Sequence, residues 1–559
     1  MDILSSKYPE MEEIFKNFKR DLPDNEEYHE RLETEIKLII KNKFIKCFIQ
    51  VVEILEITKR IPHIIRGSSG SSLICYLLGI TSFDPIMCNI SLARFMNDKR
   101  KDMPDIDIDF PYNKRDYIFR KISEKWKDKV GRISNHNMYK EKSALRKAIK
   151  DEGYNKFVPK YFSLNKLFNG ERETIKNVKN KKEDLIGTFR CYSLHCGGIV
   201  IFDEDIPDEY LVKEKQLKFN KDDVEDNGLI KIDILSNRGL AQLYNISDKP
   251  LYDYPNYDSG VTQVLIYGNN IGLTFAESPG MRKLFLKYRP RDIYGIAKCL
   301  ALIRPSASHS YNAFKNSALI YDDDAIQYIQ DVLKCDEGTA DLYRKAFKKN
   351  NHAQILDFRR KIVKNPDKDD IVQNLKNLRY YSFCKSHAYS YAQLVFALAY
   401  QKAHNPKQFW VSTLNHCNSM YRTWVHMNEA KKSGIKLSLG KRPWKLVDDK
   451  LLSKSSLGII STTKKPVEQY KKHGYWINDE FIDGMYYKET GNKIKFRGLI
   501  ATYRKYKSMY FITVGCSNDK MIDVSVPGTI NLYKKDVVEG SGVKNGFIIK
   551  CYSCVGQYL

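Results

Sequence analysis

The sequence lacks long apolar segments. It contains no uninterrupted apolar run of about 18 residues, the minimum for a membrane-spanning helix. Its first residues, Met1–Lys7, do not resemble a signal peptide. We therefore expect no membrane association and a place in the cytoplasm.

Cysteine and histidine also lack the spacings that build familiar metal sites. The 12 cysteines follow no regular order, so no disulfide framework is predicted. The Cys-x-x-Cys at Cys551–Cys554 has no second pair at zinc-finger spacing. Even the two histidines nearest in sequence, His416 and His426, are too far apart for an i, i+4 ligand pair on a helix.

Acidic residues are few relative to basic ones. The chain has 68 Asp and Glu against 93 Lys and Arg, a net charge of +25. This excess favours a polyanionic partner such as nucleic acid. An AT-rich genome that favours lysine codons is an alternative explanation. The 559 residues are too many for one core and indicate several domains.

Against this background, an alternating acidic pattern stands out between Met103 and Phe110. Asp105, Asp107 and Asp109 alternate with isoleucines, so in a β-strand the three carboxylates share one face. Carboxylates this close repel one another unless a cation lies between them. Mg²⁺ prefers such oxygen ligands, and two metal ions can promote phosphoryl transfer. A solvated acidic edge strand is the alternative.

A second motif, Arg66–Ser72, reads Arg-Gly-Ser-Ser-Gly-Ser-Ser and precedes an apolar run at 73–78. A loop of small residues at the start of a helix presents backbone N–H groups and a partial positive charge, which suits phosphate. A capped Gly/Ser turn is the alternative.

Taken together, the segment from Arg66 to Phe110 resembles the palm of C-family DNA polymerases, the bacterial replicative DNA polymerase III alpha subunits. The shared pattern is an Arg-Gly-Ser loop, an Ile-Thr-x-x-Asp-Pro turn, an Arg-Phe-x-Asn segment and Pro-Asp-x-Asp-x-Asp-Phe. The resemblance covers about residues 28–430 well. Further segments that resemble the family are Lys142–Arg146, His195–Ile201, Lys231–Leu235, Phe275–Met281, Ala301–Pro305, Tyr381–Ala392 and Lys402–Pro406.

The resemblance implies an α/β multidomain fold, with a nucleotidyltransferase-type (polymerase beta-like) palm, helical fingers and a short thumb. Only about 27 residues precede the palm, so we expect a compact version without the family's N-terminal phosphoesterase-like domain. Short alternating strands near the end of the chain predict a small β-barrel, with a sandwich or dimerisation module as alternatives. The expected divisions are an arm at 1–27, palm at 28–135 and 190–245, thumb at 136–189, fingers at 246–430, a reduced duplex-binding region at 431–492 and an OB-like β domain at 493–559.

By the same resemblance, Asp105, Asp107 and Asp233 form the catalytic, metal-binding triad, holding two Mg²⁺ ions for which Mn²⁺ could substitute. Asp109 is expected to support these ligands rather than bind metal. The expected reaction is attack of a primer 3′-hydroxyl on the α-phosphate of a deoxynucleoside triphosphate. The residues expected to bind the nucleotide are Gly67, Ser68, Arg94, Lys142, Arg146, Lys231, Arg304, Lys385, Ser386 and His387. For the cations the alternative is an ordinary surface charge, and for His387 a helix-capping role.

The sequence thus predicts a template-directed DNA polymerase that binds primer–template DNA and deoxynucleoside triphosphates. Tyr503, Tyr506 and Tyr510 in the C-terminal domain could stack on single-stranded DNA. No clear clamp-binding peptide is present, so the sequence does not decide whether a sliding clamp is a partner. A nucleotidyltransferase for primer synthesis, template-free addition or lesion bypass is one alternative, and an inactive DNA-binding scaffold is another. Reduced size and lysine-rich composition suggest a phage, virus or mobile element, acting in the host cytoplasm.

Overall fold

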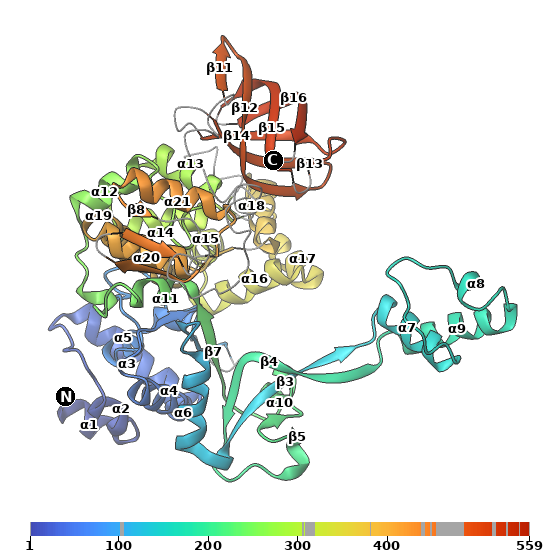
Figure 1. The fold of residues 1–559 in the computed structure, drawn as a ribbon. Coiled ribbons are helices and arrows are strands. Elements are labelled where there is room, and N and C mark those ends of the chain that lie inside the picture. The colour runs from blue at the N-terminus through green and yellow to red at the C-terminus, as the bar shows by residue number, and fades with distance from the viewer. Residues whose placement is uncertain are drawn as a thin grey trace. The chain divides into compact units, whose positions relative to one another are not determined.

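The computed structural model divides into two compact units, which are described separately (Figure 1). The first contains the described residues within 1–100, 106–116 and 236–559, and the second contains residues 117–235. No helix within the described residues is both long and apolar enough to cross a bilayer. The described residues are 2–100, 106–304, 307, 319–380, 382–416, 418–437, 442–447, 450–453, 486–516, 521–532, 535–546 and 548–557.

The first unit begins with a helical layer. Asn25 caps helix α3 by accepting a hydrogen bond from the backbone N–H of Glu27. The predicted arm is itself folded, because its Met11, Ile14 and Phe15 are buried. The helices of this layer are α1 (Asp2–Lys7), α2 (Glu12–Lys16), α3 (Glu26–Lys41) and α4 (Ile45–Ile57), with the 3-10 helix η1 (Pro9–Met11) before α2.

Two short strands follow this layer. Strand β1 (Ile64–Arg66) pairs antiparallel with β2 (Ile106–Pro111), so that Arg66 lies opposite Asp107. The 3-10 helix η2 (Ser69–Ser71) and the short helix α5 (Leu73–Leu77) come directly after β1. The predicted strand around the aspartates is therefore confirmed for its described residues.

The segment predicted as fingers is helical, and the helix that ends the predicted palm, α11, packs with it. Helix α19 (Lys385–His404) is buried over most of its length and packs against α11, α12, α14 and α20. The other helices here are α11 (Arg238–Tyr244), α12 (Ser259–Ile266), α13 (Pro279–Tyr288), α14 (Ile293–Leu302), α15 (Asp324–Leu333), α16 (Glu337–Lys349), α17 (His352–Lys361), α18 (Lys368–Lys376), α20 (Pro406–His416) and α21 (Thr423–Lys432), with 3-10 helices η5 (Leu251–Asp253) and η7 (Asn377–Arg379).

The end of the chain forms the predicted barrel. Five strands close in the order β12-β13-β14-β16-β15, because β15 also pairs with β12. Tyr506 is 54% exposed, whereas Tyr510 is only 5% exposed, so the stacking role predicted for Tyr510 is wrong. The strands are β11 (Tyr486–Thr490), β12 (Lys493–Tyr506), β13 (Met509–Gly515), β14 (Met521–Pro527), β15 (Val537–Asn545) and β16 (Ile548–Gln557), preceded by a small sheet of β8 (Lys436–Leu437), β9 (Trp444–Val447) and β10 (Lys450–Ser453).

The second unit is a sheet that carries a helical tip. Its strands follow the order β7-β4-β3-β6-β5, and β3 and β4 extend as a long antiparallel pair toward helices α7, α8 and α9 (Figure 1). Those helices occupy the predicted thumb segment. The elements are α6 (Arg115–Trp126), η3 (Lys127–Lys129), β3 (Val130–Met138), α7 (Glu141–Asp151), α8 (Leu164–Leu167), α9 (Arg172–Leu185), β4 (Phe189–Ile201), η4 (Asp208–Tyr210), β5 (Leu211–Lys213), β6 (Gln216–Leu217), α10 (Lys221–Asp226) and β7 (Lys231–Asn237), whose last two residues belong to the first unit.

Candidate active site

Strand β2 separates its carboxylates from its apolar side chains, as the alternation predicted. Ile106, Ile108 and Phe110 are completely buried, and the Asp107 carboxylate lies on the half-buried face. Apolar side chains on one face of the strand therefore anchor the acidic face. Asp105 lies outside the described residues.

Asp109 is a buried carboxylate held by protein donors. Its Oδ1 lies 2.8 Å from Arg66 Nε, and its Oδ2 accepts hydrogen bonds from Asn237 Nδ2 at 2.8 Å and the Tyr391 hydroxyl at 3.3 Å. Burial raises the pKa of Asp109, and these three donors only partly offset that effect. Since protein donors surround both oxygens, the arrangement agrees with a supporting role.

Tyr391 is itself fixed by an aromatic neighbour. Its ring stacks on that of Phe275, with ring centroids 4.1 Å apart and an interplanar angle of 12°. Phe275 has a φ of 73°, an uncommon backbone conformation for a residue with a side chain. A cavity of about 480 Å³ opens beside this cluster and is lined in part by Arg66, Asp109, Asn237, Phe275 and Tyr391.

The N-terminus of α5 is occupied by Glu35. The Glu35 carboxylate accepts hydrogen bonds from the Ser72 hydroxyl at 2.6 Å and from the backbone N–H groups of Leu73 and Ile74 at 2.7 and 3.1 Å. Arg31 Nε lies 2.8 Å from the same carboxylate. The prediction that this helix start offers free N–H groups to phosphate is therefore wrong, and Gly67 and Ser68 just before it remain the candidates.

The loop at Gly67 is joined to the start of α19. Gly67 has a φ of 79°, and its carbonyl accepts a hydrogen bond from the Ser386 hydroxyl at 2.6 Å. Lys385 donates its backbone N–H to Asp323 at 2.7 Å and its Nζ to the Asn89 carbonyl at 2.6 Å. Predicted nucleotide residues more than 300 positions apart thus meet in one place.

His387 lies among cations at the same place. Its ring contacts those of Phe383 and Tyr391, each with centroids 4.6 Å apart. Burial, together with the positive charges on Arg66, Arg304 and Arg94, lowers the pKa of His387 to about 3. The imidazole is therefore neutral at pH 7, which leaves anion binding here to the arginines.

Arg94 is held by an acidic residue that the sequence analysis did not single out. Its Nε lies 3.1 Å from the buried Asp322, which also pairs with Arg344 at 2.9 Å and Lys348 at 3.0 Å. Burial opposes ionisation of Asp322, but these cations outweigh it and lower its pKa. The run of three aspartates at 322–324 is the feature of the sequence that could have indicated this acidic partner.

In the second unit, Asp233 lies on β7 opposite Gly198 of β4. Its Oδ2 accepts a hydrogen bond from Lys231 Nζ at 2.6 Å. Its Oδ1 is 3.7 Å from Nδ1 of His195, which instead accepts the Gly198 N–H at 2.7 Å. Within the described part of the chain, Asp233 Oδ1 is thus a buried carboxylate oxygen without a hydrogen-bond donor.

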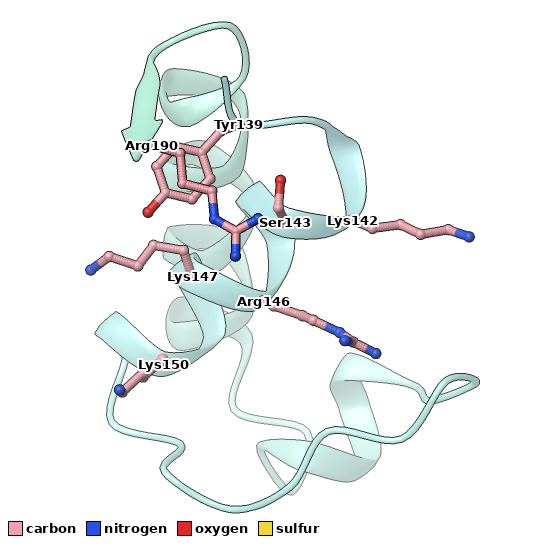
Figure 2. A pocket seen from close by; sticks show the side chains of 7 residues that line it. All are labelled: Tyr139, Lys142, Ser143, Arg146, Lys147, Lys150 and Arg190. Atoms are coloured by element: carbon pink, nitrogen blue, oxygen red, sulfur yellow. The ribbon is translucent and has the colours of Figure 1, made fainter. Parts of the chain in front are cut away.

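A basic pocket of about 390 Å³ lies on α7 at the tip of the second unit. Figure 2 shows Lys142 and Arg146 extending to one side of the helix and Lys147 and Lys150 to the other. Phe189 marks the tip end of β4, so nine strand positions separate it from Gly198, a span of roughly 30 Å. Lys142 and Arg146 are therefore distant from Asp233, which corrects the expectation that they meet a triphosphate bound there. The pocket residues are Tyr139, Lys142, Ser143, Arg146, Lys147, Lys150 and Arg190.

Comparison with known proteins shows which family the first part of this chain is similar to. Residues 7–236 match the family described as the bacterial DNA polymerase III alpha NTPase domain. The matched region includes the Gly67 loop, strand β2, helix α7 and Asp233.

Curated relatives point to the same family. The chain is 27% identical over 484 residues to DNA polymerase III subunit alpha of Ureaplasma parvum serovar 3, covering 74% of this chain and 49% of that protein. It is 27% identical over 487 residues to the subunit of the same name from Staphylococcus aureus strain COL, covering 73% and 45%. The chain is therefore similar to the bacterial DNA polymerase III alpha subunits, the family that its motifs resemble. It spans about half the length of the curated relatives it matches.

Proposed function

We propose that the chain is a template-directed DNA polymerase that adds deoxynucleotides to a primer 3′ end. The observation that carries this proposal is the meeting of three distant segments in the first unit. Strand β2 brings Asp107 and Asp109, the end of β1 and the loop after it bring Arg66 and Gly67, and α19 brings Ser386. An acidic strand beside a cationic loop and a cavity provides the elements of a nucleotidyl-transfer site.

The loop and the start of α19 would hold the triphosphate. Arg304 lies 3.8 Å from the ring centroid of Phe383, which contacts His387, and the positive charges of Arg66, Arg94 and Arg304 all act on His387. Converging cations stabilise the negative charge that a triphosphate carries and that increases during phosphoryl transfer. Ser386 would act through Gly67, because its hydroxyl holds the loop carbonyl in place.

Asp105, Asp107 and Asp233 would hold the divalent metal ions. Carboxylate oxygens suit Mg²⁺, and the Asp233 oxygen without a described donor suits a cation. Among the described residues no group of three or more metal-binding side chains is found, and Asp105 is not among those residues. When bound, such ions supply charge neutralisation and an activated 3′-hydroxyl.

The tip of the second unit would bind the phosphate backbone of primer–template DNA. Five of the seven residues that line the pocket on α7 are Lys or Arg. On the loop that follows α7, Phe157 and Tyr161 are each 85% exposed. Cations bind phosphates without reading sequence, and exposed rings can contact bases, so this surface suits DNA of any sequence. The OB-like barrel, where Tyr506 and Phe511 are exposed, would bind single-stranded template.

The test is primer extension on a defined template with Mg²⁺ and four deoxynucleotides. Asp107→Asn should abolish extension, by at least about a thousandfold, because it removes a carboxylate charge from the metal site. The matched control is Asp116→Asn, the same change at an exposed position on α6, which should extend normally. Full activity in Asp107→Asn would contradict the site, and a wild type that binds DNA without extending it would contradict the function.

A further inference from the structure

A separate cavity of about 730 Å³ lies in the first unit, at the other end of β1 from the Gly67 loop. His63, which lines it, directly precedes Ile64 at the start of the strand, whereas Arg66 ends the strand. Its volume is within the range of small-molecule sites, about 300–1,000 Å³. Lys19, Arg20, Lys59 and Arg60 line the cavity, and Asp248 is the one carboxylate among the lining residues.

Arg20 is a partly buried cation that forms no ion pair with a described carboxylate, although the charge of Asp84 acts on it from beyond ion-pair distance. Its Nη1 donates hydrogen bonds to the carbonyls of Tyr76 and Thr81, and its guanidinium lies over the rings of Tyr76 and Tyr252, 4.3 and 5.4 Å from their centroids. These contacts fix the guanidinium but do not neutralise it. Among the described residues, no carboxylate forms an ion pair with Arg20. Burial accordingly lowers its pKa.

Other partly buried arginines of this unit differ from Arg20 in this respect. Arg31 pairs with Glu35 at 2.8 Å, Arg66 with Asp109 at 2.8 Å and Arg94 with Asp322 at 3.1 Å. A buried charge is costly unless an opposite charge compensates it. Since each of the three has a carboxylate in direct contact and Arg20 has only the more distant Asp84, the charge of Arg20 points to an anion supplied by a ligand.

The rest of the cavity lining fits such an anion. Lys59 and Arg60 are exposed at its edge, and neither forms an ion pair with a described residue, whereas Lys19 pairs with Glu56 at 2.5 Å. The ring of Tyr252 is 59% exposed and offers a surface on which a base can stack. The ligand therefore needs negative charges near Arg20, Lys59 and Arg60 and an aromatic group near Tyr252.

We propose that this cavity is a second nucleotide site, which binds a nucleoside phosphate through Arg20, Lys59 and Arg60 with the base against Tyr252. The nucleoside phosphate is either a free nucleotide or one unit of a nucleic-acid strand. The site is independent of the proposed polymerase activity, because it shares no lining residue with the cavity beside Asp109.

Photolabelling of the full chain tests this proposal. The probes are 8-azido-ATP and a short oligodeoxynucleotide that carries 4-thiothymidine, used in EDTA so that binding with metal at the aspartates is suppressed. Labelled peptides are identified by mass spectrometry. We expect label on the peptide containing Tyr252, reduced at least about tenfold in Lys59→Ala/Arg60→Ala and also reduced in Tyr252→Ala. Lys364→Ala/Lys368→Ala, which removes the same charge at exposed positions, should label normally.

Each outcome decides the proposal. Labelling of this peptide by 8-azido-ATP supports it with a free nucleotide as ligand, and labelling by the oligonucleotide alone supports it with a strand. No label on the peptide, or label that the Lys59/Arg60 double variant does not reduce, would overturn it. The substituted side chains are exposed, so the variants should fold, and an unchanged thermal unfolding midpoint verifies this.

Discussion

At the scale of single residues, the candidate site consists of charges that compensate one another. In the first unit Asp109 is balanced by Arg66, and in the second Asp233 is balanced by Lys231. The Asp322 carboxylate balances the positive charges of three cations, Arg94, Arg344 and Lys348. The positions of buried charges in such groups are tightly constrained, because removing one member leaves the other charges uncompensated.

Asp322→Asn should lower the free energy of unfolding by about 3–5 kcal/mol at pH 7, because it leaves buried cations without a counter-charge. The pKa of Asp322 is lowered by folding, so its stabilisation is complete above the unfolded value of about 3.9 and is lost as the pH falls through the folded value. Urea denaturation should therefore show a difference at pH 7 that shrinks below about pH 4.

The exposed Asp331 on α15 is the matched control, and Asp331→Asn should change stability by less than about 0.5 kcal/mol. A difference between wild type and Asp322→Asn that grows as the pH falls would contradict the assigned charge state of Asp322.

The sequence could predict residues whose role follows from local pattern. Asp107 and Asp109 alternate with buried isoleucines, and the two-residue period of a strand is enough to predict that the two carboxylates share one face. Glu35 could not be inferred, because it reaches the start of α5 from another helix, 37 positions before Ser72. Tyr510 was misjudged because sequence alone does not say which face of a barrel strand is inside.

At the scale of elements, α7 is the part whose role changes most once the structure is known. The motif at Lys142–Arg146 was correctly expected to be helical, but a sequence does not give the length of the strands that carry the helix. Strands β3 and β4 place it at the tip of the second unit, next to Arg190 rather than next to Asp233 (Figure 2).

Lys142→Ala/Arg146→Ala should weaken binding of primer–template DNA, because two cations that would contact phosphates are lost. In a plot of the logarithm of the binding constant against the logarithm of salt concentration, the slope should decrease by about 2. Fluorescence anisotropy at several salt concentrations measures this slope.

Lys213→Ala/Lys221→Ala removes the same charge from β5 and α10 of the same unit and should leave the slope unchanged. If this control changes the slope equally, the effect belongs to the net charge and not to α7. If extension by the α7 variant stays impaired at saturating DNA, the two residues contribute to more than DNA binding.

At the scale of the whole molecule, we expect the protein to stay folded without the metal ions that its activity requires, because the charges compensate one another. Removal of divalent metal by EDTA should abolish primer extension while the thermal unfolding midpoint shifts by less than about 2 °C. The reason is that Arg66 and Lys231 already neutralise carboxylates of the candidate site without a metal. Differential scanning calorimetry with and without EDTA measures the midpoint, and a large decrease would show that the metal also holds the fold together.

The type of secondary structure in two long segments was predictable because each segment has its own pattern. The helical segment at 246–430 and the β-rich end show the periodicities of helices and strands. The folding of the N-terminal segment was not predictable, because its buried residues among those described, Met11, Ile14 and Phe15, are too few to form a clear apolar face.

The hydrogen bond between Ser386 and the Gly67 carbonyl also has a consequence for biosynthesis. It joins residues 319 positions apart, so the loop cannot reach its final contact until α19 has left the ribosome. At roughly 5–20 residues per second, that interval lasts on the order of 15 to 65 seconds. A nascent chain that stalls before α19 would therefore contain strand β2 and its aspartates but not the completed Gly67 loop, and truncated products should be inactive rather than error-prone.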